Sequence, residues 1–319
     1  MTHNTKVSVC VCGNIVFDVL VRPVEQLRWA ATTLVDTVTQ QLGGNAGSTS
    51  YTLAKLGIPT FVVTLVGRDH EATAILSRLE SAGVDTARVM RVDVPTSVAI
   101  SLVNQSGERA LLYQLGASAA EFPSFPISGA DHFHLAAVFR MKHLRTAAPA
   151  VLRHARELGM TTSVDTQWDT EDEWMKVLAP SLPFTDLLFV NEDEARMLTD
   201  HTDPGSAARA LQDAGAKTVC VKLGPKGCAI FSADQEFTSP GFRVNAIDST
   251  GAGDCFSAGY IAALQRNLSH PHAARFANAV GAMSVQKLGA TAGIVDWQET
   301  RTWMDQQDAR EDGFMLIEP

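Results

Sequence analysis

Small residues followed by an acid form the most informative segment of the chain, Asn245-Ala-Ile-Asp-Ser-Thr-Gly-Ala-Gly-Asp254, which contains no lysine. Apolar residues recur at helical spacing directly after it, so a helix is expected to begin near Ala252. The first N–H groups of this helix, those of Gly251, Ala252 and Gly253, lack partners within it and form an anion site. Asp254 is then placed to take the proton of a hydroxyl that attacks a phosphorus atom held there. A tight turn with an ordinary acid at the helix start is the alternative interpretation.

A glycine pair precedes a second expected helix, in Gln41-Leu-Gly-Gly-Asn-Ala-Gly-Ser48. Glycines at such a position let the backbone approach a ligand closely, and the polar side chains of Asn45 and Ser48 stand beside them. A tight turn between a strand and a helix has the same pattern. On its own this segment is therefore a weak signal for binding.

The elements that must position these loops alternate between short apolar runs and helical periodicity. Seven runs are expected to be strands: Val7–Cys12, Thr60–Val66, His132–Leu135, Met160–Val164, Leu187–Val190, Thr218–Lys222 and Ala229–Phe231. Asp69 is expected to cap a helix whose apolar stripe runs from Ala72 to Leu79. Four glycines are expected to end this helix and three others: Gly83, Gly57, Gly159 and Gly215. This alternation is typical of an α/β fold with a largely parallel sheet and helices on both faces.

Two stretches of the chain do not follow this alternation. They contain four further strand-like runs: Ile15–Val21, Thr37–Leu42, Ser97–Asn104 and Ala110–Gln114, the last two joined by a Gly-containing hairpin loop. Both stretches leave the core between a strand and a helix, where α/β folds bind ligands. We therefore expect a small antiparallel β-sheet that covers the site as a lid. The expected division is a core of residues 1–13, 43–95 and 117–319 and a discontinuous lid of residues 14–42 and 96–116.

Composition excludes several classes of protein. The 319 residues are 45% hydrophobic and 19% charged, as in ordinary globular proteins. The net charge of −9 provides no basic field, so no nucleic-acid or membrane partner is expected. No run of 18 apolar residues occurs and the N-terminus lacks the pattern of a secretory signal, so a cytoplasmic location is expected. The five cysteines are expected to be buried, reduced thiols: Cys10, Cys12, Cys220, Cys228 and Cys255.

Six segments, in order along almost the whole chain, resemble the motifs of the ribokinase, or phosphofructokinase-B, family of carbohydrate and nucleoside kinases. They are Gly13–Asp18, Gly43–Gly57, Leu65–Asp69, Asn191–Glu194, Lys222–Gly227 and Asp248–Asp254, with Ser249 where the family has Thr. The resemblance implies a ribokinase-like three-layer sandwich. It also implies transfer of the γ-phosphoryl group of Mg-ATP to a hydroxyl of a sugar, ribose-like or fructose-like, or of a nucleoside.

The resemblance further implies roles for single residues. Asp254 becomes the catalytic base, and Gly251, Ala252 and Gly253 become the anion hole. Substrate contacts are expected from Asp18, Gly43, Gly44, Asn45, Ser48, Asp248 and Arg140. ATP and its Mg²⁺ are expected near Asn191, Glu194, Lys222, Gly224, Gly227 and Asn278, with Glu194 acting on the metal directly or through water. A K⁺ site is expected from Asp248, Thr250, Ser284, Gly289 and Gly293, and a homodimer through the lid sheets.

Simpler interpretations stand beside these roles. Glu194 is also consistent with a solvated helix acid, Lys222 with a surface charge at a strand end, and Asn278 with a buried hydrogen-bonding residue. Ser48 stands where many sugar kinases of the family have Asn, and Ala136-Ala-Val-Phe-Arg140 stands where ribokinases proper place a glutamate. Arg140 either contacts an acidic or phosphorylated substrate or caps the next helix. Ribose, fructose, a 2-keto-3-deoxy acid and a nucleoside all remain open as acceptors.

Other functions are less consistent with the sequence. A regulator on the same fold is disfavoured because the base, the anion hole and the Asn-x-x-Glu motif are intact. A NAD-dependent dehydrogenase is disfavoured because Cys12-Gly13-Asn14 stands where Gly-x-Gly-x-x-Gly is needed. A metal hydrolase could use the histidine pairs 132/134 and 270/272, but no carboxylate set accompanies them.

Overall fold

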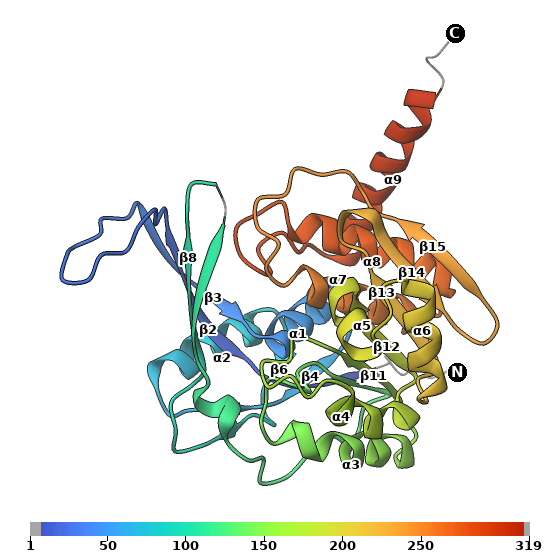
Figure 1. The fold of residues 1–319 in the computed structure, drawn as a ribbon, viewed down its shortest axis with the longest axis horizontal. Coiled ribbons are helices and arrows are strands. Elements are labelled where there is room, and N and C mark those ends of the chain that lie inside the picture. Colours follow the sequence, from blue (N-terminus) through green and yellow to red (C-terminus); the bar gives the residue numbers. More distant parts are fainter. Residues whose placement is uncertain (1–7, 107, 316–319) are drawn as a thin grey trace, which may run out of the picture.

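The computed structural model describes residues 8–106 and 108–315, of which 308–315 are described by their backbone alone. Val7, in the first expected strand, and Gly107, in the hairpin loop, lie outside these residues. A large core carries a smaller sheet that projects from one side, and the final helix α9 (Trp297–Met315) extends away from the core (Figure 1). Among the described helices, none combines the length and the apolar character needed to cross a membrane.

The core is built around a nine-stranded sheet with the order β15-β14-β13-β12-β11-β10-β1-β4-β6. Its strands are β1 (Val9–Cys12), β4 (Thr60–Val63), β6 (Val84–Asp85), β10 (His132–Leu135), β11 (Thr161–Asp165), β12 (Leu187–Asn191), β13 (Thr218–Lys222), β14 (Gly227–Phe231) and β15 (Glu236–Pro240). The strands from β13 to β6 are parallel, and β14 is antiparallel to both of its neighbours. The prediction of a mainly parallel central sheet is confirmed.

Individual strands depart from the predicted ranges. The run Thr60–Val66 is two strands, because the ladder of β4 ends at Val63 and β5 (Leu65–Val66) pairs instead with β7 (Met90–Arg91). The sequence also gave no indication of β15, β6 or β7. β15 is an edge strand with mostly polar residues and a terminal proline, a composition that resembles a loop.

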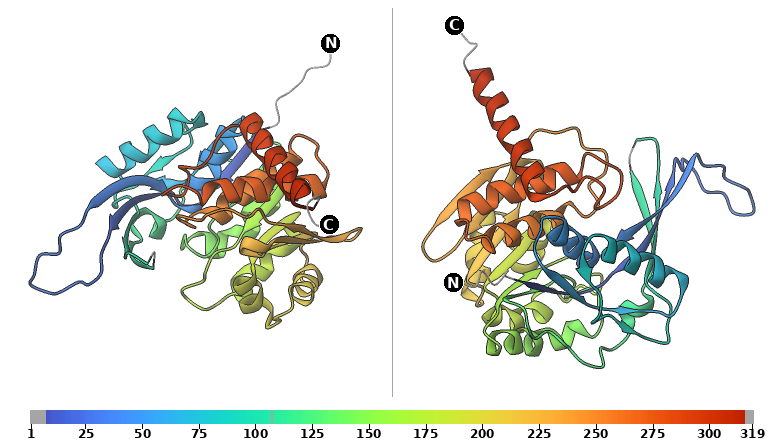
Figure 2. Two further views of the ribbon diagram at one scale, coloured as in Figure 1. Left: turned by 90° about the horizontal axis from the view of Figure 1, so that it is seen from above. Right: turned by 180° about the vertical axis from the view of Figure 1, so that it is seen from behind.

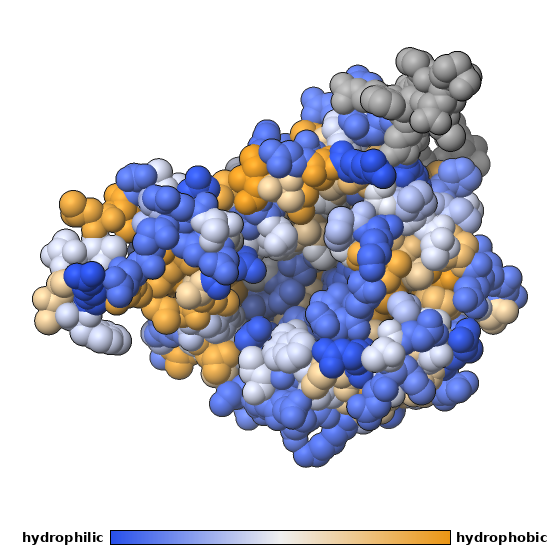
Figure 3. Space-filling view, turned by 45° about the horizontal axis from the view of Figure 1, so that its top comes forward, coloured by the Kyte–Doolittle hydropathy of each residue, from blue (hydrophilic) through white to orange (hydrophobic). Residues whose placement is uncertain are grey.

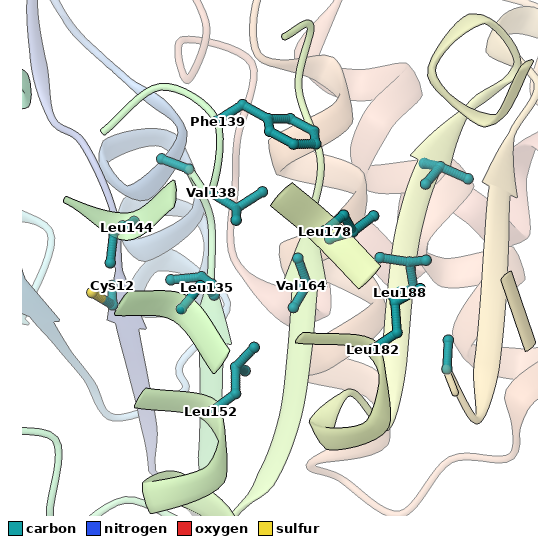
Figure 4. Close-up of a cluster of buried hydrophobic side chains, with 14 of the residues drawn as sticks. Cys12, Leu135, Val138, Phe139, Leu144, Leu152, Val164, Leu178, Leu182 and Leu188 are labelled. Carbon is teal, nitrogen blue, oxygen red and sulfur yellow. The ribbon is translucent and has the colours of Figure 1, made fainter. Parts of the chain in front are cut away.

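Residues along each core strand alternate between two hydrophobic clusters, one on each face of the sheet. On β1, Cys10 and Cys12 belong to one cluster, and Val9 and Val11 belong to the other. The first cluster, shown in part in Figure 4, is covered by α3 (Leu144–Glu157), α4 (Met175–Leu178), α5 (Glu192–Thr199) and α6 (Pro204–Asp213). The second is covered by α1 (Asn45–Lys55), α2 (His70–Ser81), α7 (Ala252–Leu264) and α8 (His270–Ser284). Helices therefore lie on both faces, as predicted (Figure 2), and all five cysteines are free and buried.

The predicted helix limits are also confirmed. The Asp69 carboxylate accepts a hydrogen bond from Ala72 N (3.0 Å) and so caps α2. The four glycines expected to end helices all have the positive φ that such a position requires.

The projecting sheet, here called the lid, has the order β3-β2-β8-β9. Its strands are β2 (Val16–Arg22), β3 (Thr37–Gly43), β8 (Val98–Val103) and β9 (Arg109–Gln114). The β2–β3 and β8–β9 pairs are antiparallel, but the central β2–β8 pair is parallel. The expected small antiparallel lid sheet is therefore present, and its central pair departs from that pattern. β2 and β8 leave the core side by side, where Phe17 N donates to Ser97 O (2.9 Å), so they run in the same direction.

Candidate active site

Polar and charged side chains collect at the carboxyl end of the parallel sheet. Asp165, Asn191 and Lys222 are the last residues of β11, β12 and β13. Because these three strands are parallel neighbours, their ends meet at one edge. The loops that follow β1 and β10 reach the same edge, and the lid stands over it.

Helix α7 begins at this edge as the sequence predicted, with Gly251 as its N-cap. Gly251 has φ +69°, and a Cβ there would lie 2.7 Å from Ala290 Cβ, so both the backbone and the space require glycine. No side chain caps the helix. Ala252 N donates a long bond (3.3 Å) to Ser249 O, whereas the N–H groups of Gly251 and Gly253 have no partner among the described residues. They lie at the positive end of the helix and can bind an anion.

A lysine lies beside this helix start, although the segment itself contains none. Lys222 Nζ is 2.6 Å from Asp165 Oδ1 and about 3.2 Å from where a Cβ on Gly253 would lie. The Lys222 side chain is 14% exposed. The interpretation of Lys222 as a surface charge is therefore wrong, because β13 delivers it into the site.

Asp165 holds the lysine in place from two strands away. Its other carboxylate oxygen, Oδ2, accepts a hydrogen bond from Ser257 Oγ (2.6 Å), which lies in α7. Burial alone would lower the pKa of Lys222, but Asp165 and Glu194 outweigh burial and hold that pKa above its ordinary value. The lysine therefore stays charged beside the helix start.

Asp254 lies in the first turn of α7, where its carboxylate is both enclosed and held. Asn45 Nδ2 donates to Asp254 Oδ1 (2.9 Å). Burial, followed by the charge of Asp165, raises the pKa of Asp254 to about 7, against the lowering effects of Asn45 and Lys222. A pKa near the working pH is the property that a general base needs.

Asp18 lies in β2 on the lid surface that faces the core. A Cβ on Gly43 would lie 2.0 Å from Asp18 Oδ2, so only glycine leaves room for this carboxylate. Burial raises the pKa of Asp18 to about 7, partly offset by Arg109 and reinforced by Asp248. Gly43 thus brings the backbone close to an acid, and contact of this segment with a substrate stays a prediction.

Asn191 and Glu194 form a reciprocal cap on α5. Glu194 N donates to Asn191 Oδ1 (2.8 Å), and Glu194 Oε2 accepts from Asn191 N (3.1 Å) and from Thr166 Oγ1 (2.9 Å). Glu194 is 5% exposed, so it is not a solvated helix acid. Burial raises its pKa. Its Oε1 accepts no hydrogen bond from the described residues, which leaves one oxygen for a hydrated cation, and oxygen ligands of this kind fit Mg²⁺.

The remaining nucleotide-site predictions fall on the β13–β14 turn and on α8. Gly224 begins the 3₁₀ turn Gly224–Lys226, and Gly227 follows it. Asn278 is buried, and its amide donates to Ser239 O (3.0 Å) and Pro240 O (3.1 Å), which ties α8 to β15. These contacts match the interpretation of Asn278 as a structural residue, and its contact with a purine stays a prediction.

The segments of the expected K⁺ site lie next to one another. Asp248 accepts hydrogen bonds from Thr250 N and Gly289 N (both 2.9 Å), and Ile247 N donates to Val285 O (2.7 Å). Ser284 precedes Val285 at the end of α8, and a Cβ on Gly293 would lie 3.0 Å from Ser284 Cα. Binding of a cation by their carbonyl groups stays a prediction.

Two atypical residues of the sequence have different surroundings. Ser48 is buried in α1, with its Oγ about 3.3 Å from where a Cβ on Gly251 would lie. The guanidinium of Arg140 lies over the Tyr113 ring of the lid, 5.3 Å from its centroid. Arg140 does not cap the next helix, since α3 begins after His143 and has no side-chain cap. That interpretation was wrong.

A cavity of about 860 Å³ lies between the lid and the core. Its lid side includes Arg22, Thr37 and Arg109, and its core side includes Asp248 and Ser249. Arg109 also donates from Nη1 to Thr250 Oγ1, so lid and core touch at this point. Figure 3 shows that this face of the molecule is hollowed between the two parts.

Several residues of the site were missed in the sequence. They are Asn14, Arg109, Tyr113, Asp165, Thr166 and Ser257. Asp165 directly follows the predicted strand Met160–Val164, so its position at a parallel-strand end was a usable signal. Arg109 and Tyr113 carried no such signal, because their orientation depends on which face of the lid turns toward the core.

The histidine pairs have structural partners. His132 bonds to Thr161 (2.8 Å) and Ser163 (2.7 Å), and burial lowers its pKa to about 4. His270 bonds to Tyr260 (2.8 Å). Within residues 8–106 and 108–315, no group of three or more His, Cys, Asp and Glu side chains is arranged to hold a metal ion by itself.

Comparisons with known proteins agree with this arrangement. The model of the pfkB family carbohydrate kinases matches residues 6–297. The ATP-dependent ribose-1-phosphate kinase of Halopiger xanaduensis is 34% identical over 257 residues, which cover 79% of this chain and 82% of that protein. A ribokinase of Haemophilus influenzae is 28% identical over 280 residues, covering 82% and 87%. The solved Arabidopsis thaliana ribokinase with ribose and ATP has a TM-score of 0.83 at 24% identity, covers 94% of this chain and 99% of its own, and shows the shared fold.

Proposed function

The chain belongs to the pfkB family of carbohydrate kinases, and on this premise we propose that it transfers the γ-phosphoryl group of ATP to a hydroxyl of a ribose-like or fructose-like sugar. As a kinase of this family it is a phosphotransferase with an alcohol group as acceptor. The observation that carries the proposal is Asp254, a buried carboxylate of raised pKa in the first turn of a helix whose N-terminus is open.

The proposed reaction is an in-line transfer. Asp254 accepts the proton of the sugar hydroxyl, whose oxygen forms a bond to the γ-phosphorus while the bond from that phosphorus to ADP breaks. Asn45 orients the Asp254 carboxylate through its 2.9 Å hydrogen bond. Because the pKa of Asp254 is about 7, a large share of the enzyme holds the ionised base near neutral pH.

We propose that two sets of groups stabilise the negative charge on the migrating phosphoryl group. Gly251, Ala252 and Gly253 form the anion hole, with the free N–H groups of Gly251 and Gly253 as its strongest donors. Lys222 supplies a full positive charge beside Gly253, and Asp165 positions that charge without touching the reactants. Transition-state charge is thus stabilised by groups that do not need to reorganise.

ATP is proposed to lie along Asn191, Lys222, Gly224, Gly227 and Asn278. Glu194, with Asn191, would hold Mg²⁺ directly or through water. When bound, the ion neutralises phosphate charge so that an alcohol can approach. We also propose a K⁺ site near Asp248, Thr250, Ser284, Gly289 and Gly293.

The sugar is proposed to lie between the lid and the core. Its hydroxyls would contact Asp18, Gly43, Gly44, Asn45, Ser48 and Asp248. The core-facing side of the lid includes the polar side chains of Arg22, Thr37 and Arg109, which suit a hydroxylated substrate, and closure of the lid would exclude water from the transfer. A nucleoside acceptor is the alternative within the same family, and a panel of pentoses, hexoses, sugar acids and nucleosides in a coupled ADP-release assay separates the two.

The outer side of the lid supports the proposed homodimer. Along β2 and β8 the outward residues are apolar, and on β3 and β9 Val38 and Leu112 are 59% and 58% exposed. A second lid could cover these side chains. We propose the cytoplasm as the location, in keeping with the use of ATP and five free cysteines.

The decisive test is Asp254→Asn, with Asp203→Asn as the matched control. Asp203 is also an acid at a helix start, but it is exposed and caps α6, a role that Asn fills equally well. Asp254→Asn should reduce kcat by roughly 10²–10⁴ while ATP binding, measured by calorimetry, stays unchanged. Turnover retained by Asp254→Asn contradicts the proposal.

A further inference from the structure

Arg140 lies in the segment that follows the carboxyl end of β10, and hydrogen bonds from the backbone hold it there. The N–H groups of Phe139 and Arg140 both donate to Gln167 Oε1, at 3.0 and 2.7 Å, in the amide orientation that satisfies both ends of Gln167. Gln167 is 8% exposed and Phe139 4%, so the turn that carries Arg140 is buried. The guanidinium therefore projects from a rigid support and not from a surface loop.

The side chain of Arg140 is directed at the acceptor side of the site. It lies over the ring of Tyr113, whose hydroxyl accepts a hydrogen bond from Asn14 Nδ2 (3.2 Å). Asn14 Oδ1 in turn accepts from Asn45 N (3.2 Å), and Asn45 holds Asp254. Tyr113 also shares the core-facing side of β9 with Arg109. Arg140 is thus linked by successive contacts to the proposed catalytic base.

The charge of Arg140 lacks a counterion in the described part of the chain. No carboxylate there lies within 4.0 Å of it, and its guanidinium donates no hydrogen bond. Arg145, five residues further along the chain in α3, does have counterions: it forms ion pairs with Asp169 (2.7 Å), Glu173 (2.8 Å) and Glu171 (3.5 Å). The partly exposed guanidinium of Arg140 therefore has donors available for an anion that arrives from outside the chain.

We propose that Arg140 binds an anionic group of the acceptor, so that the substrate is a sugar bearing a phosphate ester or a carboxylate. This inference rests on the proposed kinase function and narrows its acceptor. The planar fork of arginine matches both kinds of anion with paired hydrogen bonds. A neutral sugar would leave the fork unpaired. The Tyr113 ring, 5.3 Å from the guanidinium carbon, helps to hold the charged group in place for the anion.

The test compares three acceptors with wild-type protein, Arg140→Gln, Arg140→Lys and the control Arg153→Gln. Arg153 also lies over an aromatic ring, that of Phe184 at 4.8 Å, but is exposed on α3. The acceptors are ribose, ribose 1-phosphate and 2-dehydro-3-deoxygluconate. Arg140→Gln should lower kcat/KM for the preferred anionic sugar by roughly 10- to 100-fold and leave ribose within about twofold. For the preferred anionic sugar, Arg140→Lys should give a kcat/KM between those of the wild type and Arg140→Gln. Arg153→Gln should leave kcat/KM for all three acceptors unchanged.

The arms of the assay decide between phosphate and carboxylate, because only one of the two anionic sugars should respond to Arg140. Equal effects of Arg140→Gln on all three acceptors, or a preference for ribose, overturn the inference and leave the proposed kinase function standing. Binding is measured separately by calorimetry in Asp254→Asn, so that it does not depend on turnover. Ribose 1-phosphate or 2-dehydro-3-deoxygluconate should bind Asp254→Asn at least tenfold more tightly than Asp254→Asn/Arg140→Gln. Equal binding of both sugars to the two variants overturns the inference, whether or not ADP is released.

Discussion

The two sheets of this protein hold charged groups in opposite ways. At the edge of the nine-stranded sheet, Asp165, Lys222 and Asp254 are enclosed by helices on both sides, and Asp165 uses both carboxylate oxygens within the chain. On the lid, Arg22 and Arg109 line a cavity of about 860 Å³. The far side of the lid exposes apolar residues, and Trp29 in its outer loop is fully exposed.

This difference suggests a division of labour. Groups that stabilise a transition state act best when they are fixed before the reactants arrive. Groups that recognise a substrate must be reachable from solvent, and in an open cleft they complete their contacts only with the substrate present. We infer that the helix start, Asp254 and Lys222 perform phosphoryl transfer, and that the lid and the core residues that face it, among them Arg140, select the acceptor. Changes at the first set should then lower kcat, and changes at the second should raise KM.

The largest expected effect after loss of the base comes from Lys222→Met. Removing the positive charge beside the anion hole should lower kcat by roughly 10²–10³. It should also destabilise the fold by about 3–5 kcal/mol, because Asp165 is left buried without its partner. Lys222→Met/Asp165→Asn should recover most of this stability in urea unfolding but none of the kcat.

Lys217→Met is the matched control for this change. Lys217 Nζ also lies 2.6 Å from an aspartate, Asp186, but it is 59% exposed and precedes β13 at the opposite edge of the sheet. Its replacement should alter stability by less than about 1 kcal/mol and leave kcat unchanged. Recovery of kcat in the Lys222/Asp165 double variant would mean that the pair is structural only.

The sequence identified the local features of this arrangement better than the long-range ones. Asp69 as a cap, the helix start at Ala252 and most of the core strands are encoded in short stretches, and the structure confirms them; β6 and β15 were missed. The pairing of Lys222 with Asp165 requires β13 and β11, which are separated by β12, to end at the same height in the sheet. No local sequence pattern indicates this. The same holds for the parallel β2–β8 pair and for the direction of Arg140. Thus the motifs were enough to locate the site, but predicting which of its charged groups pair required knowledge of the sheet register.

A smaller effect, confined to substrate binding, is expected for Gly43→Ala. Its Cβ would lie 2.0 Å from Asp18 Oδ2 and must push the carboxylate away. A displacement of this size should raise KM for the acceptor by roughly 10- to 100-fold, while kcat falls much less. In the control Gly205→Ala, the nearest atoms are flexible side-chain ends 3.3 Å away, and both constants should stay the same. A fall in kcat with unchanged KM would assign Gly43 to the transfer step.

The pH dependence of kcat/KM should show the ionisation of one acid in the core and one acid in the lid. Burial raises the pKa of both Asp254 and Asp18 to about 7, and both are proposed to act as carboxylates. Lowering the pH through 7 protonates them, so kcat/KM should fall toward acid pH and reach a plateau above about pH 8. If both must be ionised, log kcat/KM falls by two for each pH unit well below 7. Asp18→Asn should reduce this slope to one, and a slope of two in that variant contradicts the role of Asp18.

The smallest effect on turnover is expected on the outer side of the lid, where neighbouring residues allow a direct comparison. Leu112 pairs with Ile100 on the outer side and is 58% exposed, while Leu111 pairs with Ser101 on the core-facing side and is 53% exposed. Leu112→Glu should convert the proposed dimer to a monomer in sedimentation and change kcat by less than about twofold. Leu111→Glu adds the same charge one residue away, but it faces the cleft and should raise KM without changing the mass. If both variants behaved alike, the two faces of the lid would not differ in function, and the division between recognition inside and assembly outside would fail.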